Sequence, residues 1–234
     1  AAGQDIAPKV RSWILSADGD YVVLILDWAQ EQILFFNDAL GRLPLYCHQD
    51  DGLFLLSREV KFLTVVKSSV TYDSQAIAEY LLFGYILGDK TLVEDISRVG
   101  GATLGRVDLT SAKVEYCTIH TFSFDDCEHA DKSLSELTSE LKARFVEVCS
   151  DISASCSDLK QVVSLSGGLD SRSVAAGMRL IGSQVTGVTF QDTGVDAMIA
   201  EQVARALGIK WRLFDLEPYN LADVKRLTKM KDGL

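Results

Sequence analysis

Six consecutive residues in the second half of the chain have the types and spacing of a phosphate-binding loop. Residues 166–171 read Ser-Gly-Gly-Leu-Asp-Ser. Glycines lack a Cβ and let the backbone approach an oxyanion closely, and the first amides of a following helix have no intrahelical acceptor. The hydroxyls of Ser166 and Ser171 add hydrogen-bond donors. The segment therefore predicts a site for a phosphorylated ligand.

The sequence around this loop predicts the strand and the helix that would position it. Residues 162–165 form a short apolar run with β-branched side chains, and residues 172–181 carry Val174, Met178 and Ile181 at helical spacing. The glycines are therefore expected at a strand-to-helix corner, where the helix dipole favours an anion. An ordinary strand-to-helix turn with a glycine pair and a serine cap is the alternative interpretation.

The charged residue of the loop predicts a metal ion. A Walker loop would have four residues between its glycines and a lysine before the last Ser or Thr, and neither is present. Instead the loop carries Asp170, a carboxylate beside the expected phosphates. Like charges are tolerated at such a distance only with a cation between them, so Mg²⁺ is expected at Asp170.

The string from Ser166 to Ser171 resembles the SGGxDS signature of the N-type ATP pyrophosphatases. Members of that family cleave ATP between its α- and β-phosphates in order to adenylate a substrate. The resemblance implies MgATP as the ligand, with Asp170 at the metal. The loop residues that it places at ATP and its pyrophosphate are Leu165, Ser166, Gly167, Gly168, Leu169, Asp170 and Ser171.

Strands and helices are expected to alternate after the loop. Residues 184–190 and 210–215 have the pattern of strands, and residues 197–207 and 219–230 that of helices. Such alternation predicts a parallel doubly wound sheet with ligands at the carboxyl ends of its strands. Asp196 either caps the helix that follows it or faces the nucleotide.

Residues 20–57 in the first half of the chain have the pattern of an antiparallel meander. Helices are expected at residues 58–65 and after Asp73, with Gly88-Asp89 ending the second, and an apolar stripe predicts another from Leu134 to Val148. The expected strands are residues 21–26, 32–36, 44–47, 53–56, 103–108 and 113–118.

Two segments of this half resemble class II glutamine amidotransferases, which are N-terminal-nucleophile hydrolase domains. Residues 37–46 are similar to the RDxxGxxPLYY segment of that family, and residues 56–63 to its ASExKAL segment. The chain departs from these patterns at Asn37, where the family usually has Arg, and at Arg58, which interrupts the ASE string. By the resemblance both segments are scaffold beneath a glutamine pocket.

Both resemblances together, in this order, are similar to asparagine synthetase. The implied fold is α+β followed by α/β: residues 1–125 hold a truncated amidotransferase-like antiparallel-sheet domain with its linker, and residues 126–234 an incomplete, doubly wound adenine-nucleotide hydrolase-like domain. The implied reaction joins glutamine-derived ammonia to aspartate through a β-aspartyl-AMP intermediate, with release of AMP and pyrophosphate. Thr189 would contact adenine through its backbone, although Phe190 stands where the family usually has Gly.

The chain is expected to be part of a longer ligase. The glutaminase of this family uses an N-terminal cysteine, whereas Ala1 offers no nucleophile. By the resemblance, the glutamine-binding segments precede the matched part, and a second ATP-contacting loop and a catalytic lysine follow Leu234. These residues are therefore expected to carry the pyrophosphate loop and no catalytic residue.

Composition limits the partners. The net charge of −10 argues against nucleic acid, and the apolar runs fall far short of the roughly 20 residues that span a membrane. Five cysteines without CxxC spacing favour a reducing, cytoplasmic setting. The expected partners are the small molecules aspartate, glutamine and ATP, with a homodimer as the candidate assembly.

Three other functions stay open. A β-lactam synthetase-like adenylating cyclase would keep both domains and lose glutaminase activity. Relatives of NAD or GMP synthetase share the loop but lack the features of residues 44–63. A non-catalytic nucleotide-binding scaffold would retain the pocket alone.

Overall fold

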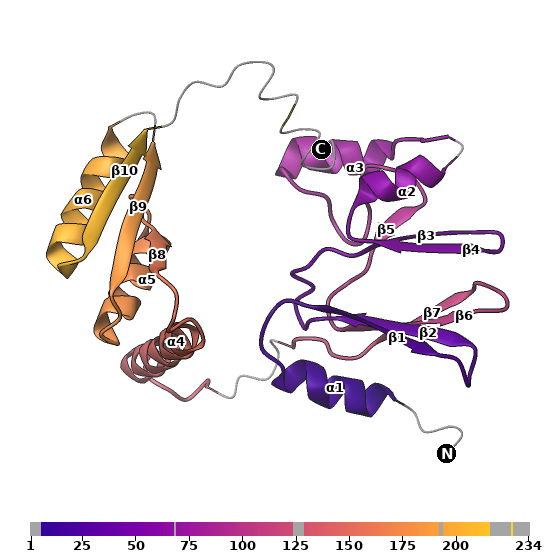
Figure 1. Ribbon diagram of the computed structural model, residues 1–234, viewed down its shortest axis with the longest axis horizontal. Coiled ribbons are helices and arrows are strands. Elements are labelled where there is room, and N and C mark those ends of the chain that lie inside the picture. The colour runs from indigo at the N-terminus through magenta and orange to yellow at the C-terminus, as the bar shows by residue number, and fades with distance from the viewer. Residues whose placement is uncertain (1–5, 68, 124–128, 192–193, 216–225, 227–234) are drawn as a thin grey trace. The chain divides into compact units, whose positions relative to one another are not determined.

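The computed structural model describes residues 6–67, 69–123, 129–191, 194–215 and 226. Apart from Arg226, these residues fall into two compact units, an amino-terminal unit within residues 1–124 and a carboxyl-terminal unit within residues 125–223 (Figure 1). Across the described ranges, each helix is too short or too polar to cross a lipid bilayer.

The amino-terminal unit contains two antiparallel sheets. The antiparallel pairing predicted for residues 20–57 is confirmed, but a single meander is wrong, because residues 32–37 pair with residues 103–108 and not with residues 46–50. One has the strand order β1-β2-β6-β7 and the other the order β4-β3-β5. The strands are β1 (Val22–Asp27), β2 (Gln32–Asn37), β3 (Tyr46–Asp50), β4 (Leu53–Ser57), β5 (Ile96–Arg98), β6 (Thr103–Asp108) and β7 (Val114–Thr118). The helices are α1 (Ala7–Ser16), α2 (Val60–Val66) and α3 (Ser74–Phe83).

These elements form helix, sheet, sheet and helix layers (Figure 1). Successive side chains of a strand point to opposite faces, so Leu34 and Phe36 of β2 pack with α1 while Phe35 packs toward the second sheet. Leu63 of α2 is buried against the outer face of that second sheet. Phe35 also lies across Gly105 of β6, where any Cβ would overlap its ring, so this sheet position requires glycine.

The sequence pattern missed some elements of this unit. It did not predict α1 or the three-residue strand β5. The cap at Asp73 is confirmed, because its carboxylate accepts the Ala76 amide at 2.9 Å. The expected end at Gly88-Asp89 is wrong, because Gly84 takes φ +78° and returns its amide to the Tyr80 carbonyl, which stops α3 at Phe83.

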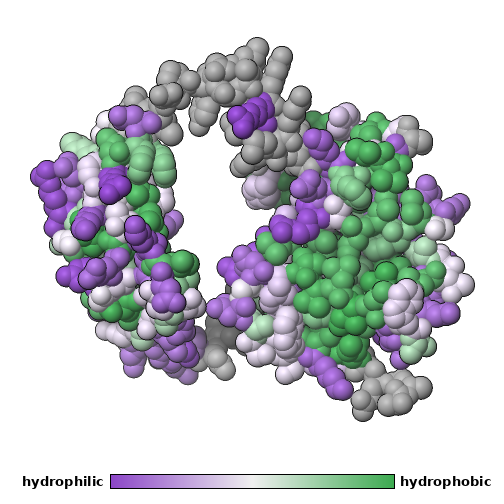
Figure 2. Space-filling model, in the orientation of Figure 1, coloured by the Kyte–Doolittle hydropathy of each residue, from purple (hydrophilic) through white to green (hydrophobic). Residues whose placement is uncertain are grey.

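Apolar side chains are exposed on parts of the amino-terminal unit, as Figure 2 shows for one face. Leu81 of α3 is 79% exposed. Strand β1 lies at one edge of its sheet, and Leu24, Leu26 and the following Trp28 are 60%, 48% and 74% exposed.

The carboxyl-terminal unit contains a parallel sheet with the strand order β10-β9-β8. Its strands are β8 (Gln161–Ser164), β9 (Val185–Gln191) and β10 (Lys210–Asp215), and its helices are α4 (Leu134–Ser155), α5 (Leu169–Leu180) and α6 (Val195–Leu207). The predicted alternation of strand and helix is confirmed from β8 to β10. The helix expected at residues 219–230 lies outside the described residues, apart from Arg226.

Both connecting helices cover the same face of the parallel sheet. Met178 of α5 and Ala204 of α6 share one buried cluster with Val163 of β8, and α4 packs against α5. Phe190 and Phe214 stack on the opposite, exposed face with ring centroids 5.3 Å apart. The three described strands follow one another across the sheet in sequence order, β8, β9 and β10. A doubly wound sheet is defined by a reversal of this strand order, and the described strands do not include that reversal.

The turn after β2 is held by two buried polar side chains. Asn37 donates from Nδ2 to the Gly100 carbonyl at 2.8 Å and accepts the Thr103 amide at 3.2 Å. The carboxylate of Asp38 accepts the amides of Leu40 and Arg42, both at 3.1 Å. Burial by itself would raise the pKa of Asp38, but these amide donors outweigh it and hold the pKa below its ordinary value.

This depressed pKa makes the amino-terminal unit sensitive to acid. The stabilisation is fully present above the unfolded pKa of about 4 and is lost as pH falls through the lower folded pKa. We expect Asp38→Asn to lower the free energy of unfolding by about 1–3 kcal/mol at pH 7, with a smaller difference from the unmutated chain at pH 2–3. Hydrogen exchange of backbone amides in β2 and β6 measures this. Glu115→Gln, at an exposed position of β7, is the control, and an Asp38→Asn effect of equal size at both pH values would contradict the account.

Candidate functional site

The glycine loop lies at the corner between β8 and α5. Strand β8 ends at Ser164, and α5 begins at Leu169 after Gly168 as its N-cap residue. The corner predicted from the sequence is confirmed, although the helix begins three residues earlier than expected. Leu169, Asp170 and Ser171 consequently form its first turn, where backbone amides have no intrahelical acceptor.

Two serine hydroxyls hold the loop from within. The Ser166 amide donates to Ser171 Oγ at 3.1 Å, the Gly168 amide donates to Ser166 Oγ at 3.2 Å, and the two hydroxyls are 3.0 Å apart. Hydroxyls rotate easily and can either donate or accept. A phosphate could therefore take over these amides and receive hydrogen bonds from both serines.

Arg172 fixes the carbonyl side of the loop. Its Nε donates to the Gly168 carbonyl at 3.2 Å, and its Nη2 donates to the Gly167 carbonyl. The guanidinium thus occupies acceptors that would otherwise repel an anion near the amides. Sequence reasoning did not single out Arg172, and its only signal is its position directly after the last serine of the motif.

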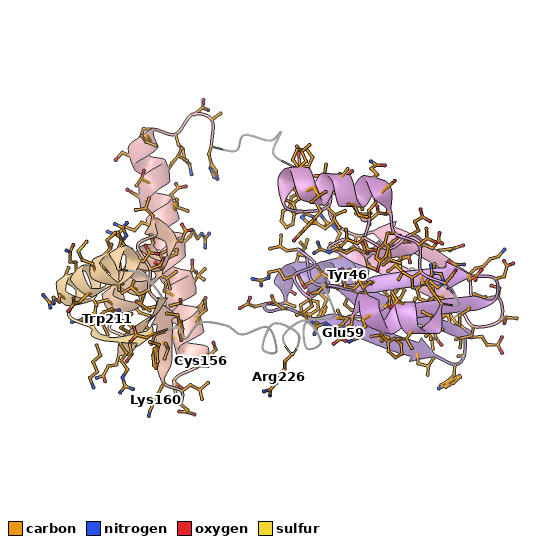
Figure 3. All side chains as sticks on the ribbon, turned by 90° about the horizontal axis from the view of Figure 1, so that it is seen from above. Tyr46, Glu59, Cys156, Lys160, Trp211 and Arg226 are labelled. Carbon is orange, nitrogen blue, oxygen red and sulfur yellow. The ribbon has the colours of Figure 1, made fainter. Side chains whose placement is uncertain are left out.

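Thr189 fixes the strand from which the loop departs. This residue is 3% exposed, and its hydroxyl donates to the Leu165 carbonyl at 2.7 Å and accepts from Trp211 Nε1 at 2.9 Å. Trp211 is labelled in Figure 3. Since the Thr189 hydroxyl is occupied, the side chain of this residue is not available to a ligand. Leu165 is 1% exposed, so its side chain belongs to the core.

The first turn of α6 packs directly against the loop. A Cβ added to Gly167 would overlap Asp196 Oδ1 and lie 3.3 Å from Ile199 Cδ1. The N-cap residue of α6 is Gly194, without a side-chain cap, so Asp196 does not cap the helix. Its carboxylate lies against Gly167 of the loop, and the interpretation in which Asp196 faces the nucleotide stays a prediction.

The acidic residues at the loop fit a metal that arrives with a nucleotide. Within the described ranges, no three His, Cys, Asp or Glu side chains lie close enough to hold an ion by themselves. Asp170 is exposed in the first turn of α5, and Asp196 lies beside Gly167. Mg²⁺ typically binds one or two protein carboxylates and completes its octahedron with phosphate oxygens and water, so this donor set is suitable.

A separate cavity of about 440 Å³ lies at the opposite end of the parallel sheet. Its lining includes Ser153 and Ser157 together with Gln161 and Gln184, which stand at the amino ends of β8 and β9. Ligands of parallel sheets bind at the carboxyl ends of the strands, which is where the loop lies. The loop is therefore the stronger candidate site.

Comparison with known families gives two matches. The model described as a glutamine amidotransferase domain matches residues 10–121. The model described as asparagine synthase matches residues 153–233, which include the whole glycine loop, Thr189 and Asp196. A search of curated proteins gives no match.

The contact between α6 and the loop predicts different effects for its two glycines. We expect Gly167→Ala to lower the free energy of unfolding by about 1–3 kcal/mol, because Asp196 and Ile199 must shift. Gly168→Ala is the matched control, since its Cβ would meet Ser166 Oγ at an ordinary 3.4 Å. Thermal denaturation measures both variants, and equal losses would rule out the close approach of α6.

The Thr189 hydroxyl predicts a second difference between matched variants. Thr189→Val leaves the Leu165 carbonyl and the Trp211 indole N–H without a partner, which should cost about 1–3 kcal/mol for each buried group. Thr186→Val makes the same change on the opposite face of β9 and should cost less. Hydrogen exchange of β8 and β9 amides reports the difference, and similar protection in both variants would refute the role of this hydroxyl.

Proposed function

Since this chain has the architecture of asparagine synthetases, with a glutamine amidotransferase part followed by a synthetase domain, we propose that it serves ATP-dependent amidation of aspartate to asparagine. The ammonia comes from glutamine. The observation that carries the proposal is the Ser-Gly-Gly-Leu-Asp-Ser loop at the β8–α5 corner, within the segment matched to asparagine synthase.

The proposed reaction has two steps. The side-chain carboxylate of aspartate attacks the α-phosphorus of ATP, and the bond to the bridging oxygen breaks so that pyrophosphate leaves. Ammonia then attacks the carbonyl carbon of β-aspartyl-AMP, loses a proton and displaces AMP. Negative charge grows on the leaving pyrophosphate in the first step, and preorganised donors stabilise such charge best.

The loop residues would stabilise that charge. Ser166, Gly167, Gly168 and Ser171 supply amides and hydroxyls to the pyrophosphate, and Arg172 keeps the loop carbonyls engaged. Asp170 would hold Mg²⁺, which when bound neutralises charge on the phosphate oxygens. The proposed ATP contacts also include the backbones of Leu165 and Leu169 on either side of the glycines, and that of Thr189 at adenine.

The amino-terminal unit would supply the amidotransferase scaffold. Its helix, sheet, sheet and helix layers fit an N-terminal-nucleophile hydrolase, and its Asn37 and Asp38 anchor the turn that resembles the amidotransferase segment. The carboxyl-terminal unit fits the start of an adenine-nucleotide hydrolase-like domain. The proposal includes a cytoplasmic location and small-molecule partners, without nucleic acid.

Equilibrium binding of MgATP to the 234-residue chain tests the loop. We expect Asp170→Ala to weaken binding at least about tenfold, because it removes the proposed metal ligand. Asp151→Ala, an exposed acidic position on α4 of the same unit, is the control and should bind like the unmutated chain. Equal binding by both variants, or no binding by the unmutated chain, would contradict the assignment.

Product analysis of the protein as its native source produces it tests the reaction. Aspartate-dependent release of AMP and pyrophosphate is the expected result. AMP release that depends on a different carboxylate substrate would point to an adenylating cyclase of the β-lactam synthetase kind. Nucleotide binding without AMP release would point to a non-catalytic scaffold.

A further inference from the structure

Asp196 is an acidic residue at the loop to which the proposed reaction assigns no step. It occupies the second position of α6, and Oδ1 of its carboxylate lies 2.4 Å from the place where a Cβ on Gly167 would be. The side chain is exposed, and among the described residues no hydrogen bond or ion pair engages its carboxylate. Its charge therefore lies at the loop without an ion pair among the described residues, and Arg172 engages the carbonyls of Gly167 and Gly168 instead.

The two acidic residues at the loop occupy equivalent positions in neighbouring strand–helix units. Asp170 is the second residue of α5, which follows β8, and Asp196 is the second residue of α6, which follows β9. Strands β8 and β9 are adjacent and parallel, so both helices begin at the same edge of the sheet. The loop consequently has one carboxylate within its helix turn and another against Gly167.

This arrangement acts differently on free and metal-bound nucleotides. The amides of the loop and the two helix N-termini attract phosphate, whereas both carboxylates repel it. A divalent cation on the phosphates converts that repulsion into attraction. A second carboxylate therefore adds little cost for metal-bound nucleotide and a larger cost for metal-free nucleotide.

We propose that Asp196, together with Asp170, makes the loop select metal-bound over metal-free nucleotides. This inference rests on the proposed function, because it takes the loop as the nucleotide phosphate site. Asp196 is thereby a specificity-determining residue. A carboxylate in a first helical turn also stabilises its helix, but that contribution would change stability and not the preference for metal.

The experiment compares ATP binding by the 234-residue chain in excess Mg²⁺ and in EDTA. The selectivity is the dissociation constant for ATP in EDTA divided by the dissociation constant in excess Mg²⁺. We expect Asp196→Asn to lower this ratio about three- to tenfold, mainly through tighter binding of metal-free ATP, and added salt should shrink the difference. Asp170→Asn is expected to lower the ratio as well.

Glu201→Gln provides the matched control. It removes the same charge from the same helix, at a carboxylate that pairs with Arg205 at 2.6 Å and lies away from the loop. Its ratio should equal that of the unmutated chain. If Asp196→Asn does not fold, Asp196→Ser removes the charge with a residue that is well suited to helix starts.

The outcomes separate this inference from the proposed function. A ratio unchanged in the folded Asp196 variant, with MgATP still bound by the unmutated chain, would overturn the role of Asp196 alone. Equal changes in Asp196→Asn and Glu201→Gln would also overturn it, since overall charge would then explain the effect. Failure of the unmutated chain to bind MgATP would instead overturn the proposed function.

Discussion

The hydroxyl of Thr189 is the contact on which the geometry of the loop depends. It ties the Leu165 carbonyl at the end of β8 to β9, and it accepts the indole N–H of Trp211 from β10. All three strands are thereby joined at the point where the backbone turns into the glycine loop. The loop itself is held by hydrogen bonds of Ser166, Ser171 and Arg172 within the same segment. Its geometry therefore depends mainly on the position of the strand end from which it starts.

Local patterns predicted most of the fold. Strands β6 and β10 have the limits expected from their residue types, and the corner at residues 166–168 follows from an apolar run, two glycines and an amphipathic helix. The failures have local causes. Gly84 is free to adopt a positive φ and ended α3 early, while β5 has only three residues and pairs with β3 from about fifty positions away. Pairing between strands so far apart in the sequence produces no periodic pattern of residue types.

The residues that form the site were only partly predictable, because some of them meet through contacts between distant parts of the sequence. The motif identified residues 166–171, because their chemistry is contiguous in the sequence. It could not decide whether Asp196 caps its helix, since that depends on the approach of α6 to Gly167 from almost thirty residues away. Similarly, the hydroxyl of Thr189 is structural because Trp211 reaches it from another strand. These roles therefore depend on tertiary contacts. The sign of such contacts in the sequence is the glycine at position 167.

The exposed edge of β1 has a consequence for the behaviour of this chain at high concentration. Among the described strands, β1 pairs only with β2, and its other edge presents backbone N–H and C=O groups beside Leu24 and Leu26. An apolar strand with a free edge is a template for pairing with another molecule, which is the first step of aggregation. A net charge of −10 spread over the whole surface opposes this only weakly, because such pairing requires contact at a single edge. We therefore expect aggregation at high concentration to depend on the edge of β1 as well as on total charge.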